Sequence, residues 1–329
     1  KRLRRIPKMR LQRGRSWSNM LLERERNANR AVAVDRSAWY MPRVELLSAE
    51  AAATFHLSHL DPATQQFIDD STANSDAFCL QVYYSMATAI LSVFFTKTSI
   101  NGLLSRGGMF LFSEDHLRDF LQIPAEWTPN DKMVLDLGAG DGGVTEVLAS
   151  LFSTVHTTEM SQIMQWRLRQ RGFTVVDASS WHLSTHSYSL ISALNLLDRH
   201  FSPRLLLSQL HSKSSKSGCD VLLSLVLPIR HYVEFRPTGS GARPEAYLEV
   251  SGNTLEEQAA SLITGEFRSA GFQVLRWTKL PYLCEGDFFH PFYTLDDAIF
   301  LLRSLPSSVS QPPQKPSPSR TLPSTRAEL

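Results

Sequence analysis

A glycine-rich stretch preceded by an acid is the part of this chain best suited to bind a cofactor. Residues 133–143 read Met-Val-Leu-Asp-Leu-Gly-Ala-Gly-Asp-Gly-Gly. The apolar run predicts a buried parallel strand, and the glycines predict a tight turn into a helix over 143–152. Gly138 and Gly140 permit positive φ and a close approach of the backbone to a ligand. The helix would direct its N-terminal amide groups toward that ligand.

Two classes of ligand fit such a turn, and a turn without a ligand is the third possibility. Gly138, Gly140 and Gly143 have the G-x-G-x-x-G spacing of dinucleotide sites, a pattern of low specificity when found alone. S-adenosyl-L-methionine (SAM) instead carries an ammonium and a sulfonium group and no pyrophosphate. Asp136, two residues before the first glycine, suits these cations and would lie unfavourably beside a pyrophosphate. The sequence therefore favours SAM over a nicotinamide dinucleotide.

A second acid supports a nucleoside ligand of either class. Residues 154–158 predict the next strand, and Glu159 follows it. Glu159 lies about twenty residues after the glycine turn, where an acid accepts hydrogen bonds from ribose hydroxyls. A solvated acid at a strand end is the alternative, which the combination with Asp136, Gly138 and Gly140 disfavours.

Two polar residues follow the fourth predicted strand, at the edge where open α/β sheets bind ligands. Asn195 is expected to hold the amino acid end of the cofactor, or the substrate. Asp198 is a carboxylate placed to orient a nucleophile, with a helix cap as the alternative. Further along, residues 280–287 predict a loop between the last two strands. Tyr282 in this loop would close over the cofactor or the target, or else pack in the core with its hydroxyl satisfied.

Alternating strands and helices surround these motifs and predict a parallel sheet with helices on both faces. The strands are expected at 133–137, 154–158, 174–176, 188–193, 219–227 and 272–278. The helices are expected at 143–152, 161–171, 203–211 and 255–270. A final strand near 297–302 would pair antiparallel to 272–278. This α/β arrangement is the seven-stranded, Rossmann-like fold of SAM-dependent methyltransferases, whereas dehydrogenases usually lack the terminal hairpin.

Composition divides the chain further. Residues 1–45 form a basic arm, expected to be disordered, because residues 1–30 hold eleven Lys or Arg against two acids. Residues 46–125 predict a helical cap, and residues 126–304 the SAM-dependent methyltransferase domain. The Pro- and Ser-rich residues 305–329 are expected to be disordered.

The most apolar segment is residues 78–95, close to the length of about 18 to 20 residues that crosses a membrane. Polar residues interrupt it at Gln81, Ser85, Thr88 and Ser92. We therefore expect a buried helix of the cap and no transmembrane segment. Residues 98–109, with Arg106 and two glycine sites, predict a shaped segment over the nucleoside turn.

The overall composition excludes some partners. The 329 residues are 43% apolar and 20% charged, with a formal charge of +2, which does not indicate sequence-specific nucleic-acid binding. The three cysteines lack metal-ligand spacing and point to a reducing, intracellular environment without disulfides, with the compartment left open. We expect no metal and a monomer.

Several of these motifs resemble the methyltransferase-like protein 9 (DREV) family. The resemblance runs from about residue 98 to 302 and is densest at 98–104, 135–142, 194–199 and 280–287. It implies a SAM-dependent protein-histidine methyltransferase that forms pros-methylhistidine, modifying the ring nitrogen nearer the backbone (Nπ). The implied targets are proteins with His-x-His motifs that have a small residue in the middle. The basic arm and the Pro/Ser-rich tail are unlike the family.

The resemblance also implies residue roles. Glu159, Asn195 and Tyr282 match positions that contact the cofactor, and Asp136 and Gly138 match the glycine-turn motif. Neutral imidazole is nucleophilic near pH 7, so such an enzyme must select the nitrogen, align it and exclude water. A carboxylate that accepts the Nτ proton would leave the Nπ lone pair free, and Asp198 is the candidate.

Three alternatives remain. A SAM-dependent methyltransferase could act on Lys, Arg or a small molecule, although the chain has no Asn-Pro-Pro-Tyr-type motif. A non-catalytic SAM-binding protein is disfavoured by the intact Asp136, Glu159 and Asn195. An NAD-dependent dehydrogenase would bind a nicotinamide cofactor and not SAM.

Overall fold

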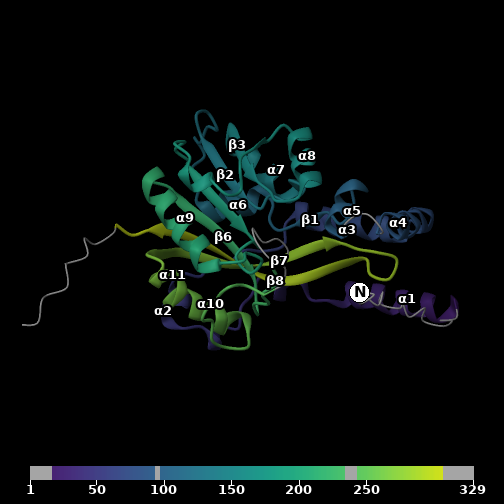
Figure 1. Cartoon of the computed structure of the whole chain (residues 1–329). Coiled ribbons are helices and arrows are strands. Elements are labelled where there is room, and N and C mark those ends of the chain that lie inside the picture. The colour runs from purple at the N-terminus through teal and green to yellow at the C-terminus, as the bar shows by residue number, and fades with distance from the viewer. Residues whose placement is uncertain (1–16, 93–96, 234–242, 307–329) are drawn as a thin grey trace, which may run out of the picture.

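The computed structural model describes residues 17–92, 97–233 and 243–306. A mixed sheet of eight strands crosses its centre in the order β1-β7-β8-β6-β5-β2-β3-β4, with helices on both faces (Figure 1). The strands are β1 (Met109–Phe110), β2 (Met133–Leu137), β3 (Thr154–Thr158), β4 (Thr174–Val175), β5 (Leu190–Leu194), β6 (Asp220–Val226), β7 (Phe272–Glu285) and β8 (Phe292–Ser304). The α-helices are α1 (Trp17–Ala33), α2 (Ala49–Ala53), α3 (Pro62–Asp76), α4 (Phe78–Leu91), α5 (Lys97–Leu103), α6 (Glu114–Leu121), α7 (Gly143–Ala149), α8 (Gln162–Gln170), α9 (Pro203–Ser217), α10 (Leu255–Thr264) and α11 (Glu266–Ser269).

The parallel half of the sheet confirms the sequence prediction. β2 pairs in parallel with β3 and β5, and β5 pairs in parallel with β6. The bounds of β2 and β3 coincide with the predicted strands, because each is a short run buried on both faces between clear turn signals. The carboxyl ends of these strands therefore meet at one edge of the sheet, where the predicted site residues lie.

The antiparallel hairpin of β7 and β8 is also present, and both strands are longer than expected. The predicted loop at 280–287 is wrong over most of its length, because β7 continues to Glu285. The end of β7 pairs with β1 through Leu283 and Cys284. The Pro-Tyr and Glu-Gly dipeptides in this stretch had suggested a loop. Pro281 lies before the residues of β7 that pair with β1, so the N–H group that proline lacks is not needed for hydrogen bonds to β1. The two-residue β1 thus adds an eighth strand to the seven that were predicted.

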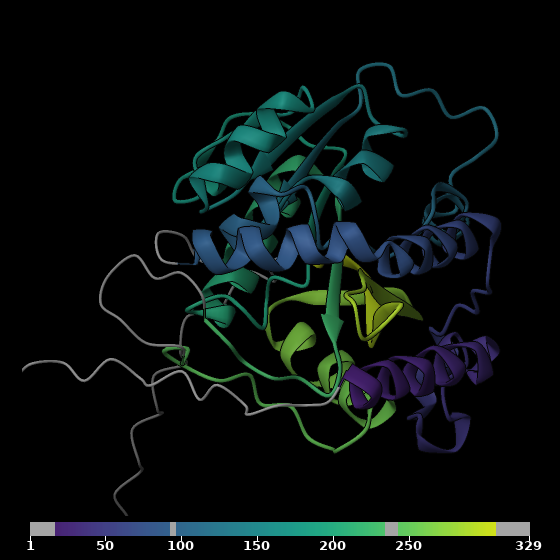
Figure 2. The same cartoon turned by 90° about the vertical axis from the view of Figure 1, so that its right-hand side faces the viewer.

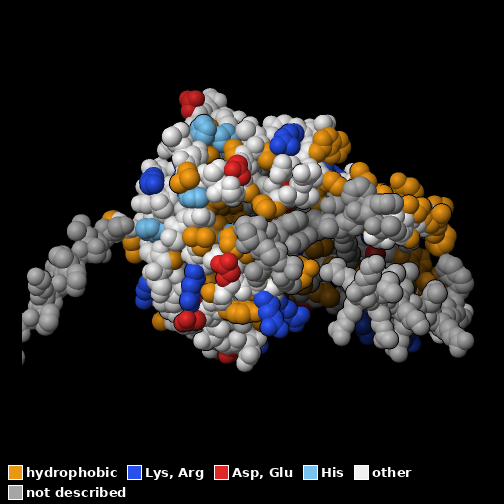
Figure 3. Space-filling view, viewed as in Figure 1, with side chains coloured by type: hydrophobic (Ala, Val, Ile, Leu, Met, Phe, Trp, Pro, Cys, Tyr) orange, Lys and Arg blue, Asp and Glu red, His pale blue; other side chains and the backbone are white. Residues whose placement is uncertain are grey.

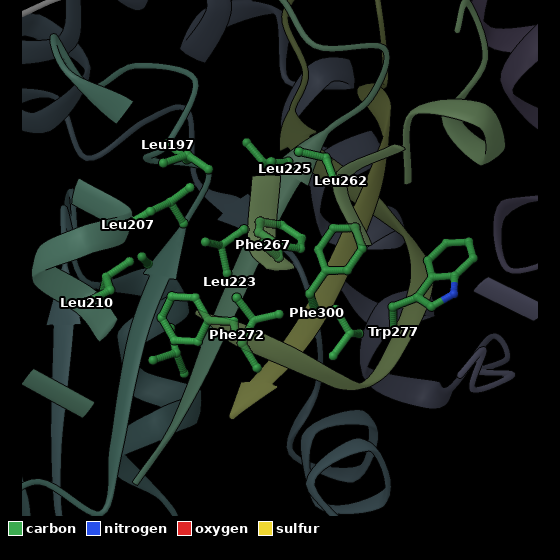
Figure 4. Close-up of a cluster of buried hydrophobic side chains, with 14 of the residues drawn as sticks. Leu197, Leu207, Leu210, Leu223, Leu225, Leu262, Phe267, Phe272, Trp277 and Phe300 are labelled. Carbon is green, nitrogen blue, oxygen red and sulfur yellow. The ribbon is translucent and has the colours of Figure 1, made fainter. Parts of the chain in front are cut away.

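Two buried clusters hold the layers together. One lies between the sheet and α9, α10 and α11, and Figure 4 shows Leu207, Phe267 and Phe300 among its side chains. The other lies between the sheet and α3, α6 and α7. The single helix predicted over 255–270 is two helices, because the chain bends at Gly265, where an added Cβ would lie 2.8 Å from the Ser261 carbonyl oxygen.

The N-terminal region differs from the expected disordered arm. Residues 1–16 lie outside the described residues, and α1 and a short 3-10 helix, Arg36–Trp39, follow them. Trp39 and Tyr40 are only 6% and 2% exposed and belong to the second buried cluster. Their burial ties residues 39 and 40 to the core, although the many arginines of this region suggested disorder. The expected disordered tail lies almost entirely in residues 307–329, outside the described part of the chain.

The cap is helical, as expected, but its most apolar helix is not buried. Among the residues of α4, only Gln81 is buried. The prediction of a buried helix over 78–95 is therefore wrong for 78–91, while 93–96 lie outside the described residues. Within the described chain, no helix combines the length and apolarity needed to cross a membrane.

Candidate functional site at the carboxyl edge of the sheet

The glycine turn between β2 and α7 leaves room for a ligand. Gly138, Gly140 and Gly142 have φ values of +71°, +58° and +84°, which side-chain-bearing residues rarely adopt. A Cβ at Gly138 would lie 2.9 Å from Leu196 Cδ1, so a larger residue there would have to move the Leu196 side chain as well as adopt the positive φ. A Cβ at Gly140 would meet no atom within 4 Å. The backbone at Gly140 therefore faces open space, as a cradle for a cofactor would require.

Asp136 lies beneath this turn and is held by internal partners. Its carboxylate is 3% exposed and accepts hydrogen bonds from Thr145 Oγ1 at 2.6 Å and Ser192 Oγ at 2.7 Å. Burial raises the pKa of Asp136 to about 6. Asp136 thus ties the end of β2 to α7 and β5, and its attraction for a bound cation remains a prediction.

Glu159 connects the glycine turn to the start of α8. Its carboxylate accepts hydrogen bonds from the Gly140 amide at 3.0 Å and the Ser161 amide at 2.8 Å. Both bonds hold the carboxylate beside the glycine turn, where the ribose contact is predicted. The predicted ribose contact is compatible with this geometry.

Asn195 directly follows β5 and has a left-handed backbone conformation, with φ of +50°. Its side-chain oxygen accepts from the Val226 amide at 3.0 Å, and its Nδ2 donates to Asp297. Its own amide N–H donates to Ser224 at 3.1 Å. Asn195 is 8% exposed, so its side chain fastens the ends of β5, β6 and β8 to one another.

Asp297 is a residue of this site that the sequence reasoning did not single out. Its side chain is 0% exposed, and its Oδ1 accepts no hydrogen bond from the described residues. Burial, together with the nearby Asp198 carboxylate, raises the pKa of Asp297 to about 8. The available signal was an acid directly before the apolar run 298–302.

Asp198 follows Asn195 by three residues and has a free acceptor atom. The side chain is 9% exposed, and its Oδ1 lies buried without a hydrogen-bond partner among the described residues. Burial raises the pKa of Asp198 to about 6, against the opposing charge of Arg199. The neighbouring Leu197 is buried in the cluster that α9, α10 and α11 form with the sheet (Figure 4). Because α9 begins at Pro203 with Ser202 as its cap residue, Asp198 does not cap that helix.

Tyr282 lies on β7 and not in a mobile loop. It is 9% exposed, and its hydroxyl donates to Met109 Sδ. Burial raises its pKa, and the charges of Asp297, Arg199 and Asp198 act on the same hydroxyl. The structure therefore brings Tyr282, Asn195 and Asp198 into one neighbourhood, although they come from distant parts of the sequence.

The two groups of predicted residues are adjacent. The Asp136 and Glu159 carboxylates interact electrostatically at the glycine turn. Leu196 lies between this group and Asp198, since it packs on Gly138 and follows Asn195 directly. The segment 98–109 also reaches the turn, because the Met109 carbonyl would lie 3.8 Å from a Cβ at Gly143.

A separate cavity of about 390 Å³ lies between α9 and α11. Its charged lining residues bind one another, since Arg204 donates to Glu266 and pairs with Glu249 at 3.0 Å. None of the predicted site residues lines it, so it is not the candidate site. In the described chain, no group of three His, Cys, Asp or Glu could hold a metal ion.

The sequence model of a family described as DREV methyltransferase matches residues 39–304. Among solved structures, similarity is found to a magnesium protoporphyrin IX methyltransferase from Synechocystis (14% identity, TM-score 0.36, 58% of this chain and 82% of that one). A TehB-like SAM-dependent methyltransferase from Corynebacterium glutamicum has 13% identity and a TM-score of 0.35. That match covers 54% of this chain and 82% of the other. A glycopeptide N-methyltransferase complexed with SAM has 15% sequence identity and a TM-score of 0.37. That match covers 59% of this chain and 87% of the other. At these values the structural similarities add nothing to the family match.

Proposed function

Because the chain belongs to the DREV methyltransferase family and is a SAM-dependent methyltransferase, we propose that it methylates histidine Nπ in His-x-His motifs of proteins. The observation that supports this most directly is the Asp198 carboxyl, which is buried at the carboxyl edge of the sheet with Oδ1 unpartnered among the described residues. A buried acceptor without a donor leaves a polar atom unsatisfied, unless a substrate group supplies the hydrogen bond.

The residues around the glycine turn fit SAM. Gly140 leaves space for the cofactor, and the Gly140 and Ser161 amides hold the Glu159 carboxylate beside that space. When bound, SAM supplies an electrophilic methyl group. The target nitrogen would approach from the side of Asn195 and Asp198, beyond the end of β5.

Asp198 would select the nitrogen that reacts. Its pKa of about 6 leaves most of the carboxylate ionised at pH 7, so it can accept a hydrogen bond from Nτ–H of the target ring. The Nπ lone pair then forms the bond to the methyl carbon as the carbon–sulfur bond breaks and its electron pair stays on sulfur. The methylated ring carries a positive charge, which Asp198 stabilises before it takes the Nτ proton.

This arrangement suits histidine better than lysine. Neutral imidazole is the main form near pH 7 and needs no base before it attacks. A lysine amine has a pKa of about 10.4, and a neighbouring carboxylate would stabilise its unreactive ammonium form. A single ionised carboxylate at Asp198 therefore favours a ring nucleophile.

The proposal is tested by incubating the protein with labelled SAM and a His-Ala-His peptide, followed by fragmentation to locate the methyl group. We expect the methyl on Nπ, and no label in a matched peptide with Lys in place of each His. A protein that binds SAM but labels neither peptide, or labels only the Lys peptide, would contradict the histidine assignment while leaving the methyltransferase family intact.

A further inference from the structure

The exposed side of α4 is a continuous apolar strip. Val82, Met86 and Ile90 are four residues apart and so follow one side of the helix, with Tyr83 next to them. Val82 is 40% exposed, Met86 62%, Ile90 65% and Tyr83 57%. Together, these four residues are the α4 surface. Figure 2 shows α4 lying across the face nearest the viewer, and Figure 3 shows apolar side chains gathered in its region.

This surface is unusual for a helix of a folded domain. The sequence of α4 contains no Asp, Glu, Lys, Arg or His, and its opposite side is only partly covered. A helix that is apolar all round is normally buried or in contact with lipid. Exposed apolar patches of this kind mark sites of interaction with a partner or a membrane.

The rest of the cap holds α4 with its apolar strip outward. Gln81, on the other side, donates to the Asn74 carbonyl at 2.8 Å. The Arg106 guanidinium lies 4.9 Å from the centre of the Tyr84 ring. Phe78 packs edge-on against Phe288 at 6.1 Å, and Arg24 lies over that same Phe288 ring at 5.1 Å. Cationic side chains thus lie beside α4 both near its start and near its middle.

We propose that the α4 surface docks onto a lipid bilayer that contains anionic headgroups. The 14 residues of α4 extend about 21 Å at 1.5 Å per residue, too short for a hydrocarbon core of about 30 Å. The helix would therefore lie in the plane of the interface, with Met86 and Ile90 among the acyl chains.

The charge pattern identifies the occupant. Residues 1–16, which lead into α1, contain eight Lys or Arg and no Asp or Glu. Basic residues near an interfacial helix strengthen its binding to anionic lipid. A second copy of this chain would bring Arg24 and Arg106 toward the same cations of its partner, so charge disfavours self-association through α4. Two acids lie beside α4 and have partners of their own. Asp76, two residues before the helix, pairs with Arg24. Glu285, whose charge acts on Tyr84 of α4, accepts a hydrogen bond from the Gly107 amide.

The test is cosedimentation of the full chain with phosphatidylcholine vesicles, with and without phosphatidylserine. The variant Met86→Glu/Ile90→Glu places two acids on the α4 surface. The matched control, Leu183→Glu/Leu205→Glu, changes two side chains that are 71% and 45% exposed on other elements. The pair Met86→Ser/Ile90→Ser removes the apolar groups without adding charge. SAM binding by calorimetry checks the fold of every variant, because none of these residues belongs to the candidate site.

We expect the parent and the control to pellet with vesicles that contain phosphatidylserine, and the glutamate variant to stay in the supernatant. The serine variant should lose most of the pelleted fraction. The proposal is overturned if the parent does not pellet, or if the glutamate and serine variants pellet as the parent does. It is also overturned if light scattering finds a dimeric parent and monomeric α4 variants, since a second copy would then cover the surface.

Discussion

The Asn195 side-chain amide donates a hydrogen bond to the carboxyl group of Asp297, which is completely buried. This contact joins the end of β5 to β8, two strands separated in the sheet by β6. It also fixes the left-handed backbone at Asn195, from which the chain turns toward Asp198. Asp297 therefore positions the turn that carries the two residues predicted to face the substrate.

The first prediction concerns pH. The pKa of Asp297 is raised to about 8 in the folded chain, against about 3.9 when unfolded. Between these pH values the folded state binds more protons, so the free energy of unfolding contributed by Asp297 falls as pH rises from about 4 to about 8. Asp136 and Asp198 contribute in the same direction only up to about pH 6. Above about pH 6 the remaining overlap comes from His156, His200 and His231, whose pKa values burial lowers from 6.5, and a comparison with a variant at Asp297 cancels their contribution.

Asp297→Asn should make that dependence shallower, because the amide resembles the protonated acid and keeps an acceptor for Asn195. Asp297→Ala should cost about 1–3 kcal/mol at pH 6, since the Asn195 amide loses its buried partner. Urea unfolding of the parent and both variants at several pH values measures this. Equal slopes for the parent and Asp297→Asn between pH 6 and 8 would mean that Asp297 does not hold a proton in the folded state.

The second prediction concerns the glycine turn. Gly140→Asn should strongly weaken SAM binding, because its side chain would enter the open space above the turn. Asparagine tolerates the left-handed conformation, so the fold should survive. Gly218→Asn is the matched control, since Gly218 has φ of +66° and also has no atom within 4 Å of an added Cβ. Calorimetry should find parental affinity only in the control; similar affinities in both variants would contradict a cofactor at this turn.

The third prediction concerns Glu159. Glu159→Ala should weaken SAM binding by about 1.5–3 kcal/mol, the range for hydrogen bonds to a charged group. Glu146→Ala is the control, because Glu146 lies on α7 nearby, and its half-exposed carboxylate pairs with Arg171. If the Glu159 and Glu146 variants bind SAM equally well, Glu159 serves only to anchor Gly140 and Ser161.

Local pattern was sufficient for much of the fold and for most of the candidate site. The five-residue apolar runs of β2 and β3 end at turn signals, so their bounds and the residues after them could be predicted. The role of Asp297 could not be predicted, because its partner Asn195 is 102 residues away and no local pattern links the two residues. The length of β7 depends on β1 and β8 as neighbours, and Pro281 beside Tyr282 imitates a loop. Apolarity predicted a helix at α4, but whether another element covers it is a property of the packing.

The fourth prediction tests the N-terminal boundary. Trp39→Ala should lower the free energy of unfolding by about 3–5 kcal/mol, the cost of truncating a buried Trp. The ring is 6% exposed and packs edge-on against Phe292 at 6.1 Å. Trp166→Ala, at a position that is 55% exposed, should change the stability much less. Denaturation of both variants decides this, and equal midpoints would place residues 36–40 outside the folded core.

The most direct measurement is steady-state methylation of a His-x-His peptide by Asp198→Ala and Asp198→Asn, with the modified nitrogen identified by fragmentation. The account predicts that both variants keep nearly parental SAM affinity and lose about 10²–10⁴ in turnover, the usual contribution of a positioned acid or base. Asp198→Asn should be nearly as damaging as Asp198→Ala, because it keeps the shape and loses the charge. Residual product should also show weaker preference for Nπ. Parental turnover by Asp198→Ala with Nπ selectivity intact would contradict the orienting role of Asp198.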